Sequence, residues 1–275
     1  MNPAAADPLP KLTWIEGSAG DPDLAPLWTL IRDYVAGLAD GAFELNFTHL
    51  PAEAGGVRHP ATRLLQDSIM LTAAADAAAD ADVVILGCWA SPIIEARALL
   101  DTPVTGLAEG SARIGAAFGS RLAVVTVAEG LRPGFERDLA LFVAPDNLLA
   151  PPVWWLDPQC RPDDLLTAVD SPGHLIDRFD AVATRAADAG ADAILTGCGS
   201  VGALLAVHGY RHPRTRPDVP VLDCDASTYH LARTLHDLHR AGSHPSRTAY
   251  PPVPPDRRPA LDAAMTRLIR AAHHP

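Results

Sequence analysis

The sequence predicts an α/β protein with two similar lobes, each a mostly parallel sheet flanked by helices, related by a pseudo-dyad with the site between them. Short apolar runs alternate with alanine-rich helical stretches, which is typical of repeated strand–helix units. Hydrophobic residues make up 48% of the chain and aromatic residues only 5%, so small aliphatic side chains do most of the packing. Such side chains favour helices packed closely on a sheet over a β-sandwich.

The elements can be assigned in order from apolar periodicity and turn residues. The clearest strands are expected at Leu12–Ile15, Val83–Leu86, Leu122–Val127 and Ala193–Thr196. Weaker strands are expected at Phe43–Phe47, Val104–Leu107, Val153–Leu156 and Val221–Asp223. Helices are expected at Leu24–Leu38, Ala61–Ala79, Pro92–Leu99, Leu131–Phe142, Leu175–Ala189, Val201–Val207, Ser227–Arg240 and Pro259–Ala272. The proline-rich stretch Pro245–Pro259 is interpreted as either an ordered surface arm or a linker.

An internal repeat indicates that the two lobes are related. The segment Asp82–Cys88 matches Asp192–Cys198, and the same offset of 110 residues aligns Lys11–Ile15 with Arg121–Val125. Any α/β protein contains several apolar strands that end in glycine. Equal spacing in two blocks, with a cysteine after the glycine both times, favours a true repeat.

The repeat predicts how the chain divides. We expect one lobe from residues 11–118 plus 223–275, which carries Cys88, and a second lobe from residues 119–222, which carries Cys198. Ligands of parallel sheets bind at the carboxyl ends of strands, and both cysteines fall there. The two thiols are therefore expected at one cleft between the lobes.

These cysteines are candidates for acid–base chemistry. Ser91 and Ser200 are expected to cap the helices that follow, so that each thiol lies near a helix N-terminus, where its pKa is lowered. One thiolate can remove a proton next to a carbonyl while the other thiol returns a proton to the opposite face. The remaining cysteines, Cys160 and Cys224, lack the preceding glycine and a repeat partner, and are interpreted as structural.

At these residues the chain resembles the aspartate/glutamate/hydantoin racemase superfamily, in its hydantoin-racemase-like branch. The stretches that carry the likeness are Gly87–Cys88, Thr105–Gly110 through Val124–Thr126, Gly197–Gly199 and the tail Ser246–Pro251. The resemblance implies a two-lobed fold and cofactor-free catalysis by Cys88 and Cys198. It also implies that the Thr126 hydroxyl and the loop amides of Trp89 and Gly199 hold the substrate's carboxylate or carbonyl.

The chain departs from the family pattern around the expected site. Ile15–Ser18 replaces an Asn-Pro-Asn-like loop, bulky Trp89 follows the first cysteine, and Gly199-Ser200 follows the second. We include Glu16, Ser18 and Ser200 among the substrate-binding residues. Since Glu16 would repel a carboxylate, an uncharged or aromatic-bearing amino-acid or hydantoin-like substrate fits better than free glutamate.

Other functions remain open at this point. A maleate-type cis–trans isomerase, or a specialised biosynthetic isomerase or cyclase, would use the same fold, and two retained cysteines count against a single-cysteine decarboxylase. A two-lobed small-molecule binding protein would share the architecture without needing paired thiols. His236 and His239 lie three residues apart on one expected helix, but zinc needs more ligands, so no metal site is expected.

Composition excludes several classes. The net charge is −11 with no basic cluster, so nucleic acid and anionic membranes are not expected partners. Lys11 is the only lysine and lies in no pyridoxal phosphate or P-loop setting, and no cofactor is expected. No signal peptide or membrane span is visible. We expect a cytoplasmic homo-oligomer that acts on a small molecule.

Overall fold

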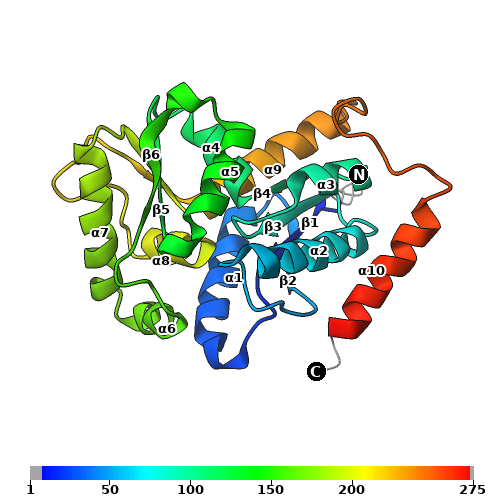
Figure 1. Cartoon of the computed structure of the whole chain (residues 1–275), viewed down its shortest axis with the longest axis horizontal. Helices are drawn as coiled ribbons and strands as arrows, with labels where there is room; N and C mark the ends of the chain where they lie inside the picture. Colours follow the sequence, from blue (N-terminus) through cyan, green and yellow to red (C-terminus); the bar gives the residue numbers. More distant parts are fainter. Residues whose placement is uncertain (1–7, 273–275) are drawn as a thin grey trace, which may run out of the picture.

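The computed structural model describes residues 8–272, and within them two four-stranded parallel sheets form the framework (Figure 1). The first sheet has the strand order β2-β1-β3-β4, and the second has the order β6-β5-β7-β8. The strands are β1 (Lys11–Glu16), β2 (Glu44–His49), β3 (Val83–Gly87), β4 (Val104–Gly106), β5 (Leu122–Thr126), β6 (Leu148–Trp155), β7 (Ala193–Thr196) and β8 (Val221–Leu222). The expected two-lobed α/β fold is confirmed.

Equivalent backbone contacts relate the two sheets. The Lys11 amide donates to Asp82 Oδ2 at 2.7 Å, and the Arg121 amide donates to Asp192 Oδ1 at 2.7 Å. Each aspartate precedes an inner strand of its sheet, β3 or β7, and accepts from the residue at the start of the neighbouring strand. The repeat inferred from sequence spacing is therefore present in three dimensions.

Helices cover the faces of both sheets. They are α1 (Ala25–Ala39), α2 (Pro60–Ala77), α3 (Ile93–Leu99), α4 (Leu107–Gly115), α5 (Arg132–Phe142), α6 (Pro162–Asp170), α7 (Gly173–Asp188), α8 (Gly199–Val207), α9 (Cys224–Arg240) and α10 (Arg258–Ala272). Three short 3₁₀ helices lie at Pro22–Leu24, Glu129–Leu131 and Pro145–Asn147. Covered on both faces, β3, β5 and β7 are buried along their whole length, as is usual for parallel sheets.

The sequence did not predict helices α4 and α6. Helix α4 is short, follows β4 without a connecting loop and contains Gly110, a residue of low helix propensity, so the sequence gives no clear sign of its start. Helix α6 begins with Pro162, and its first turn is acidic. Both features are typical of a helix N-terminus, so the sequence does contain a signal for this helix. Strand β6 starts five residues earlier than expected, and its prolines are tolerated because it lies at a sheet edge and is irregular against β5.

The last fifth of the described chain, from α9 onward, returns to the first sheet. Helix α9 packs against α4, β3 and β4, and α10 packs against α2. Between them the proline-rich stretch crosses the outer surface as an irregular segment, orange to red in Figure 1. Arg247 donates to the Arg97 carbonyl and Tyr250 contacts the Arg97 guanidinium, so this stretch is an ordered surface arm.

Across residues 8–272, no helix has both the length and the apolar character needed to cross a membrane.

Candidate active site

Both Gly-Cys segments stand where strands of the two sheets end. Cys88 follows β3 directly, and Cys198 follows β7 after Gly197. Neither Gly87 nor Gly197 has a positive φ, so backbone conformation does not require glycine at either position. Space is the reason. A Cβ on Gly87 would lie 2.4 Å from the Trp14 indole nitrogen, and one on Gly197 would lie 2.8 Å from the Phe135 ring.

A pocket of about 410 Å³ brings the two cysteines together. This volume lies within the usual range for small-molecule sites. Seven of the residues singled out in the sequence line it: Glu16, Ser18, Cys88, Trp89, Cys198, Gly199 and Ser200. Thr126 does not. Its side chain is buried, and its hydroxyl donates to the Gly197 carbonyl at 3.3 Å, which braces the turn that carries Cys198.

The expected serine caps are wrong at both cysteines. The Ser91 hydroxyl donates back to the Cys88 carbonyl, and α3 begins at Ile93 without a side-chain cap, so Cys88 is separated from that helix. At the second site Cys198 itself is the N-cap residue, and Ser200 already belongs to the first turn of α8. Only Cys198 therefore lies directly at a helix N-terminus.

Both thiols have raised pKa values, contrary to the expectation from helix dipoles. The pKa of Cys88 is raised to about 12, mainly by burial and next by the nearby Glu16 carboxylate, against a hydrogen bond from the Ala90 amide. Burial also raises the pKa of Cys198, although amides of α8 oppose that effect. Desolvation of a thiolate outweighs the helix terminus here. The resting site accordingly favours thiols.

Glu16 is the most perturbed carboxyl group that lines the pocket. It ends β1, and burial raises its pKa to about 7. Its charge raises the pKa of Cys88 and of Cys198. Because strands β1 and β3 are neighbours, the carboxyl group and the first thiol leave the sheet at the same edge. Below about pH 7 this group is a neutral acid that can donate a hydrogen bond.

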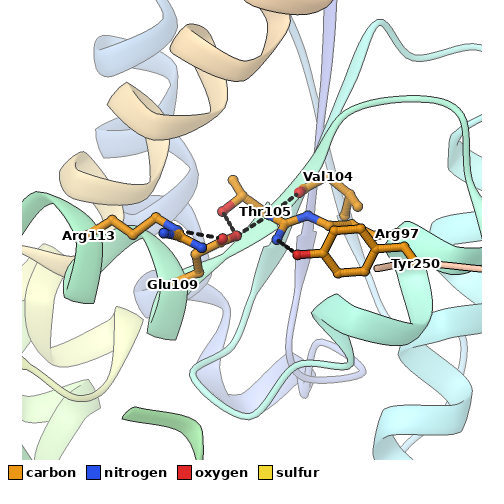
Figure 2. A network of polar contacts seen from close by, with 6 residues as sticks. All are labelled: Arg97, Val104, Thr105, Glu109, Arg113 and Tyr250. Atoms are coloured by element: carbon orange, nitrogen blue, oxygen red, sulfur yellow. Dashed lines mark hydrogen bonds and ion pairs between the residues drawn. The ribbon is translucent and has the colours of Figure 1, made fainter. Parts of the chain in front are cut away.

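The arginines Arg97 and Arg113 do not line this pocket. Figure 2 shows them on either side of Glu109, which is 1% exposed and accepts from Arg113 Nε at 2.7 Å and from the Arg97 guanidinium. Thr105 also donates to Glu109, at 3.0 Å. Arg97 is thus a buried structural residue rather than a surface one.

Known protein families include one that matches most of this chain. The family model for "Asp/Glu/Hydantoin racemase" matches residues 29–232, which is most of the chain. The chain belongs to this family. It is therefore an isomerase of the racemase type. No curated protein matches the chain.

Solved structures of racemases share the fold of this Asp/Glu/hydantoin racemase family member. An allantoin racemase from Klebsiella pneumoniae is 16% identical, covers 89% of this chain and 94% of its own, and has a TM-score of 0.71. The allantoin racemase AllR from Pseudomonas fluorescens is 20% identical, covers 89% and 97%, and has a TM-score of 0.67. A glutamate racemase from Thermus thermophilus is 15% identical, covers 94% and 93%, and has a TM-score of 0.52.

In this racemase-family chain, sequence reasoning missed a wall of the pocket built from both lobes. The irregular segment 50–59 after β2 contributes Val57 and Arg58, and Arg58 donates to Gln159 Oε1 and to the Cys160 carbonyl, both at 3.1 Å. Cys160, interpreted as structural, is buried and also lines the pocket. No local sequence pattern predicts such a contact, because the partners are about one hundred residues apart in sequence.

A second missed feature is an aromatic pair that closes one side of the pocket. The rings of Trp89 and Phe135 are parallel within 3°, with centroids 4.8 Å apart. Trp89 comes from the segment after β3 of the first sheet, whereas Phe135 comes from α5, which follows β5 of the second sheet, so the stack links the two lobes. Trp89, the bulky residue after Cys88, therefore forms part of the pocket wall by stacking on Phe135.

Proposed function

We propose that this protein is a cofactor-independent racemase or epimerase in which Cys88 and Cys198 are the acid and base at a carbon next to a carbonyl. One observation carries the proposal. Two thiols from equivalent strand ends of a repeated unit line one pocket. A pair of groups that approach a carbon from two sides can invert it without any other reagent.

The reaction balances with protein groups alone. The thiolate of one cysteine takes the proton from carbon, and the electron pair moves onto the neighbouring carbonyl to give an enolate. The thiol of the other cysteine then gives its proton to the opposite face of the carbon. The backbone amides of Ala90 and Val201, which already donate to the two sulfurs, stabilise negative charge at each end of the path.

The pocket favours a neutral substrate with an apolar substituent. Its walls include Trp28, Val57, Trp89, Val127, Leu131, Phe135 and Leu165. The carboxyl groups of Glu16 and Glu53 also line it and are matched by two arginines, Arg161 and Arg58, of which Arg58 is engaged by the opposite wall. A free amino acid would bring its own carboxylate beside Glu16. A cyclic amide such as a 5-substituted hydantoin avoids that repulsion and offers an acidic carbon next to a carbonyl.

Proton exchange in deuterated water tests this function. 5-Benzylhydantoin, 5-methylhydantoin, allantoin, aspartate, glutamate and maleate would each be incubated with the protein and followed by proton NMR and polarimetry. We expect deuterium at carbon 5 of the benzyl compound, accompanied by loss of optical rotation, faster than in protein-free buffer. Cys88→Ser and Cys198→Ser should each lower the enzyme-dependent racemisation on the order of 100-fold or more, since each removes one acid–base group.

Controls separate this outcome from its rivals. Cys160→Ser makes the same chemical change at a third thiol that lines the pocket but does not follow a strand-end glycine, and should lower racemisation far less than Cys88→Ser or Cys198→Ser. Racemisation that persists in the double variant Cys88→Ser, Cys198→Ser would contradict the mechanism. Conversion of maleate to its trans isomer, without exchange in any hydantoin, would instead support the cis–trans isomerase.

A further inference from the structure

Asp225 is a buried carboxyl group directly beneath the loop that carries Cys198. It lies in the first turn of α9 and is 1% exposed. Its Oδ1 atom would be only 3.0 Å from a Cβ placed on Gly199, the residue that follows Cys198. A methyl carbon of Leu107 would lie 3.2 Å from the same Cβ. A side chain at position 199 would push Asp225 away, so glycine permits this contact.

Asp225 is not needed to cap its own helix. Asp223 does that, since its carboxylate accepts from the amides of Asp225 and Ala226 and from the Tyr34 hydroxyl. Asp225 receives only a long contact from the Cys224 thiol at 3.9 Å, and its Oδ2 atom has no hydrogen-bond partner. No ion pair involving Asp225 occurs in the described part of the chain. A buried carboxyl group left so poorly paired is destabilising unless it is protonated.

The groups around Asp225 are mostly acidic and come from several elements. On its own helix Asp223 and Cys224 face it, and Glu16 acts on it from the end of β1. Tyr34 of α1 and Arg211 affect the ionisation of Asp223, and they influence Asp225 only through that residue. Burial, then Asp223 and Glu16, raise the pKa of Asp225 well above its ordinary value. The carboxyl group therefore holds a proton in conditions where a surface aspartate would not.

Asp225 lies beside one of the two thiols, because its Oδ1 atom borders Gly199, the chain neighbour of Cys198. Its charge is among the causes that raise the pKa of Cys198. The acidic groups that raise the pKa of Cys88 are instead Glu16, Cys198 and Asp67. While Asp225 is neutral, Cys198 can ionise with the help of the α8 amides; once Asp225 ionises, a second buried negative charge opposes it.

We propose that Asp225 is a positioning residue that sets the pH at which Cys198 gives up its proton, and so makes the two thiols of the pocket inequivalent. The catalytic consequence rests on the proposed function above, because an acid–base pair needs one group protonated and the other not. Asp225 itself does not touch the substrate pocket and acts only through Cys198.

The test measures each thiol without any substrate. Iodoacetamide alkylates thiolates, and peptide mass spectrometry reports the alkylation rates of Cys198 and Cys88 separately as the pH is varied. In Asp225→Asn, which has the size of the neutral acid but cannot ionise, the midpoint for Cys198 should move to lower pH by about one unit, and that for Cys88 should stay. Asp237→Asn, the same change at an exposed site on α9, should move neither midpoint.

A purely structural Asp225 would give a different result. Asparagine would then leave the Cys198 midpoint where it is in the parent protein, and that outcome overturns the proposal. Asp225→Ser is a second neutral variant and must shift Cys198 in the same direction if Asp225→Asn does not fold. A shift of both thiols by equal amounts would also contradict the selective role.

Activity then separates the two proposals. If hydantoins exchange, the pH profile of Asp225→Asn should move for the direction of reaction in which Cys198 is the base, with little change in the other direction. If no substrate exchanges but the Cys198 midpoint moves, the proposed reaction fails while the role of Asp225 stands.

Discussion

Glu16 shows how a single residue can link the stability of the protein to its site. The residue is 8% exposed, and burial raises the pKa of its carboxyl group from 4.5 to about 7. The folded protein therefore binds this proton more tightly than the unfolded chain does. Stability from this group is fully present below about pH 4.5 and is lost as the pH rises through 7.

A pH series tests that linkage. Ionising Glu16 in the folded state costs roughly 3 kcal/mol, because each tenfold change in an acid constant is worth about 1.4 kcal/mol. We expect urea unfolding of the parent protein to lose up to that amount between pH 5 and pH 8 relative to Glu16→Gln, which cannot ionise. Parallel curves for the two proteins over this range would show that Glu16 titrates normally.

Gly17 is held close to the first catalytic candidate. A Cβ at this position would lie 2.5 Å from the Cβ of Cys88 and 3.1 Å from its sulfur. Gly17→Ala should displace Cys88 and lower racemase activity by about 10-fold or more, since misplacement by about 1 Å has large effects on rate. Gly37→Ala is the control, because Gly37 is exposed in α1 with open space around it. It should keep activity and gain about 0.5–1 kcal/mol of stability.

At the scale of elements, the Glu109 network holds α3, α4 and the C-terminal arm together. Burial alone would raise the pKa of Glu109, but the positive charges and hydrogen bonds of Arg97 and Arg113 outweigh burial. The pKa of Glu109 is therefore below its ordinary value. Arg97 is 9% exposed and Arg113 is 47% exposed at the side chain. The two ion pairs should therefore contribute different amounts to the free energy of unfolding, because water screens the outer pair.

Single substitutions measure that difference. Arg97→Ala breaks the buried pair alone and leaves Glu109 with only its outer arginine partner, and should cost about 3 kcal/mol in urea unfolding. Arg113→Ala should cost no more than about 1 kcal/mol. Equal losses in the two variants would mean that the outer pair is as well shielded as the inner one.

The elements also show what a sequence can and cannot foretell. The strands were predictable because a buried parallel strand is a short, nearly continuous apolar run, as in Ala193–Thr196. Helix starts were less predictable, since Ser91 uses its hydroxyl on the Cys88 carbonyl instead of capping α3. The thiol pKa values were misjudged because the sequence shows a helix terminus but not how much protein surrounds it.

At the scale of the whole molecule, Arg58 joins segment 50–59 to the segment before α6 across the pocket. Such a pairing depends on how the two halves pack, so it lay outside what the repeat could predict. The positions of the two thiols, by contrast, followed from local spacing. Arg58 and the Trp89–Phe135 stack thus complete a pocket whose thiols were visible in the sequence.

Removing this contact should weaken substrate binding more than chemistry. Without the Arg58 guanidinium, segment 50–59 loses its hydrogen bonds to Gln159 and Cys160. The segment must then become ordered when the substrate binds, and the entropy lost in this step weakens binding. We expect Arg58→Ala to raise KM severalfold with a smaller change in kcat, measured on the best hydantoin substrate. Arg32→Ala, at an exposed surface pair with Asp33, should leave both constants unchanged. A fall in kcat alone would place Arg58 in the chemical step instead.

The matched hydrogen bonds from Lys11 to Asp82 and from Arg121 to Asp192 show that one structural unit occurs twice in a single gene product. A dimer of identical halves would present the same residue on both sides of a ligand, and every mutation would change both sides. Here one half can place Trp89 after its cysteine while the other keeps Gly199. Encoding both halves in one chain lets a nearly symmetric pair of thiols acquire different surroundings by independent mutation.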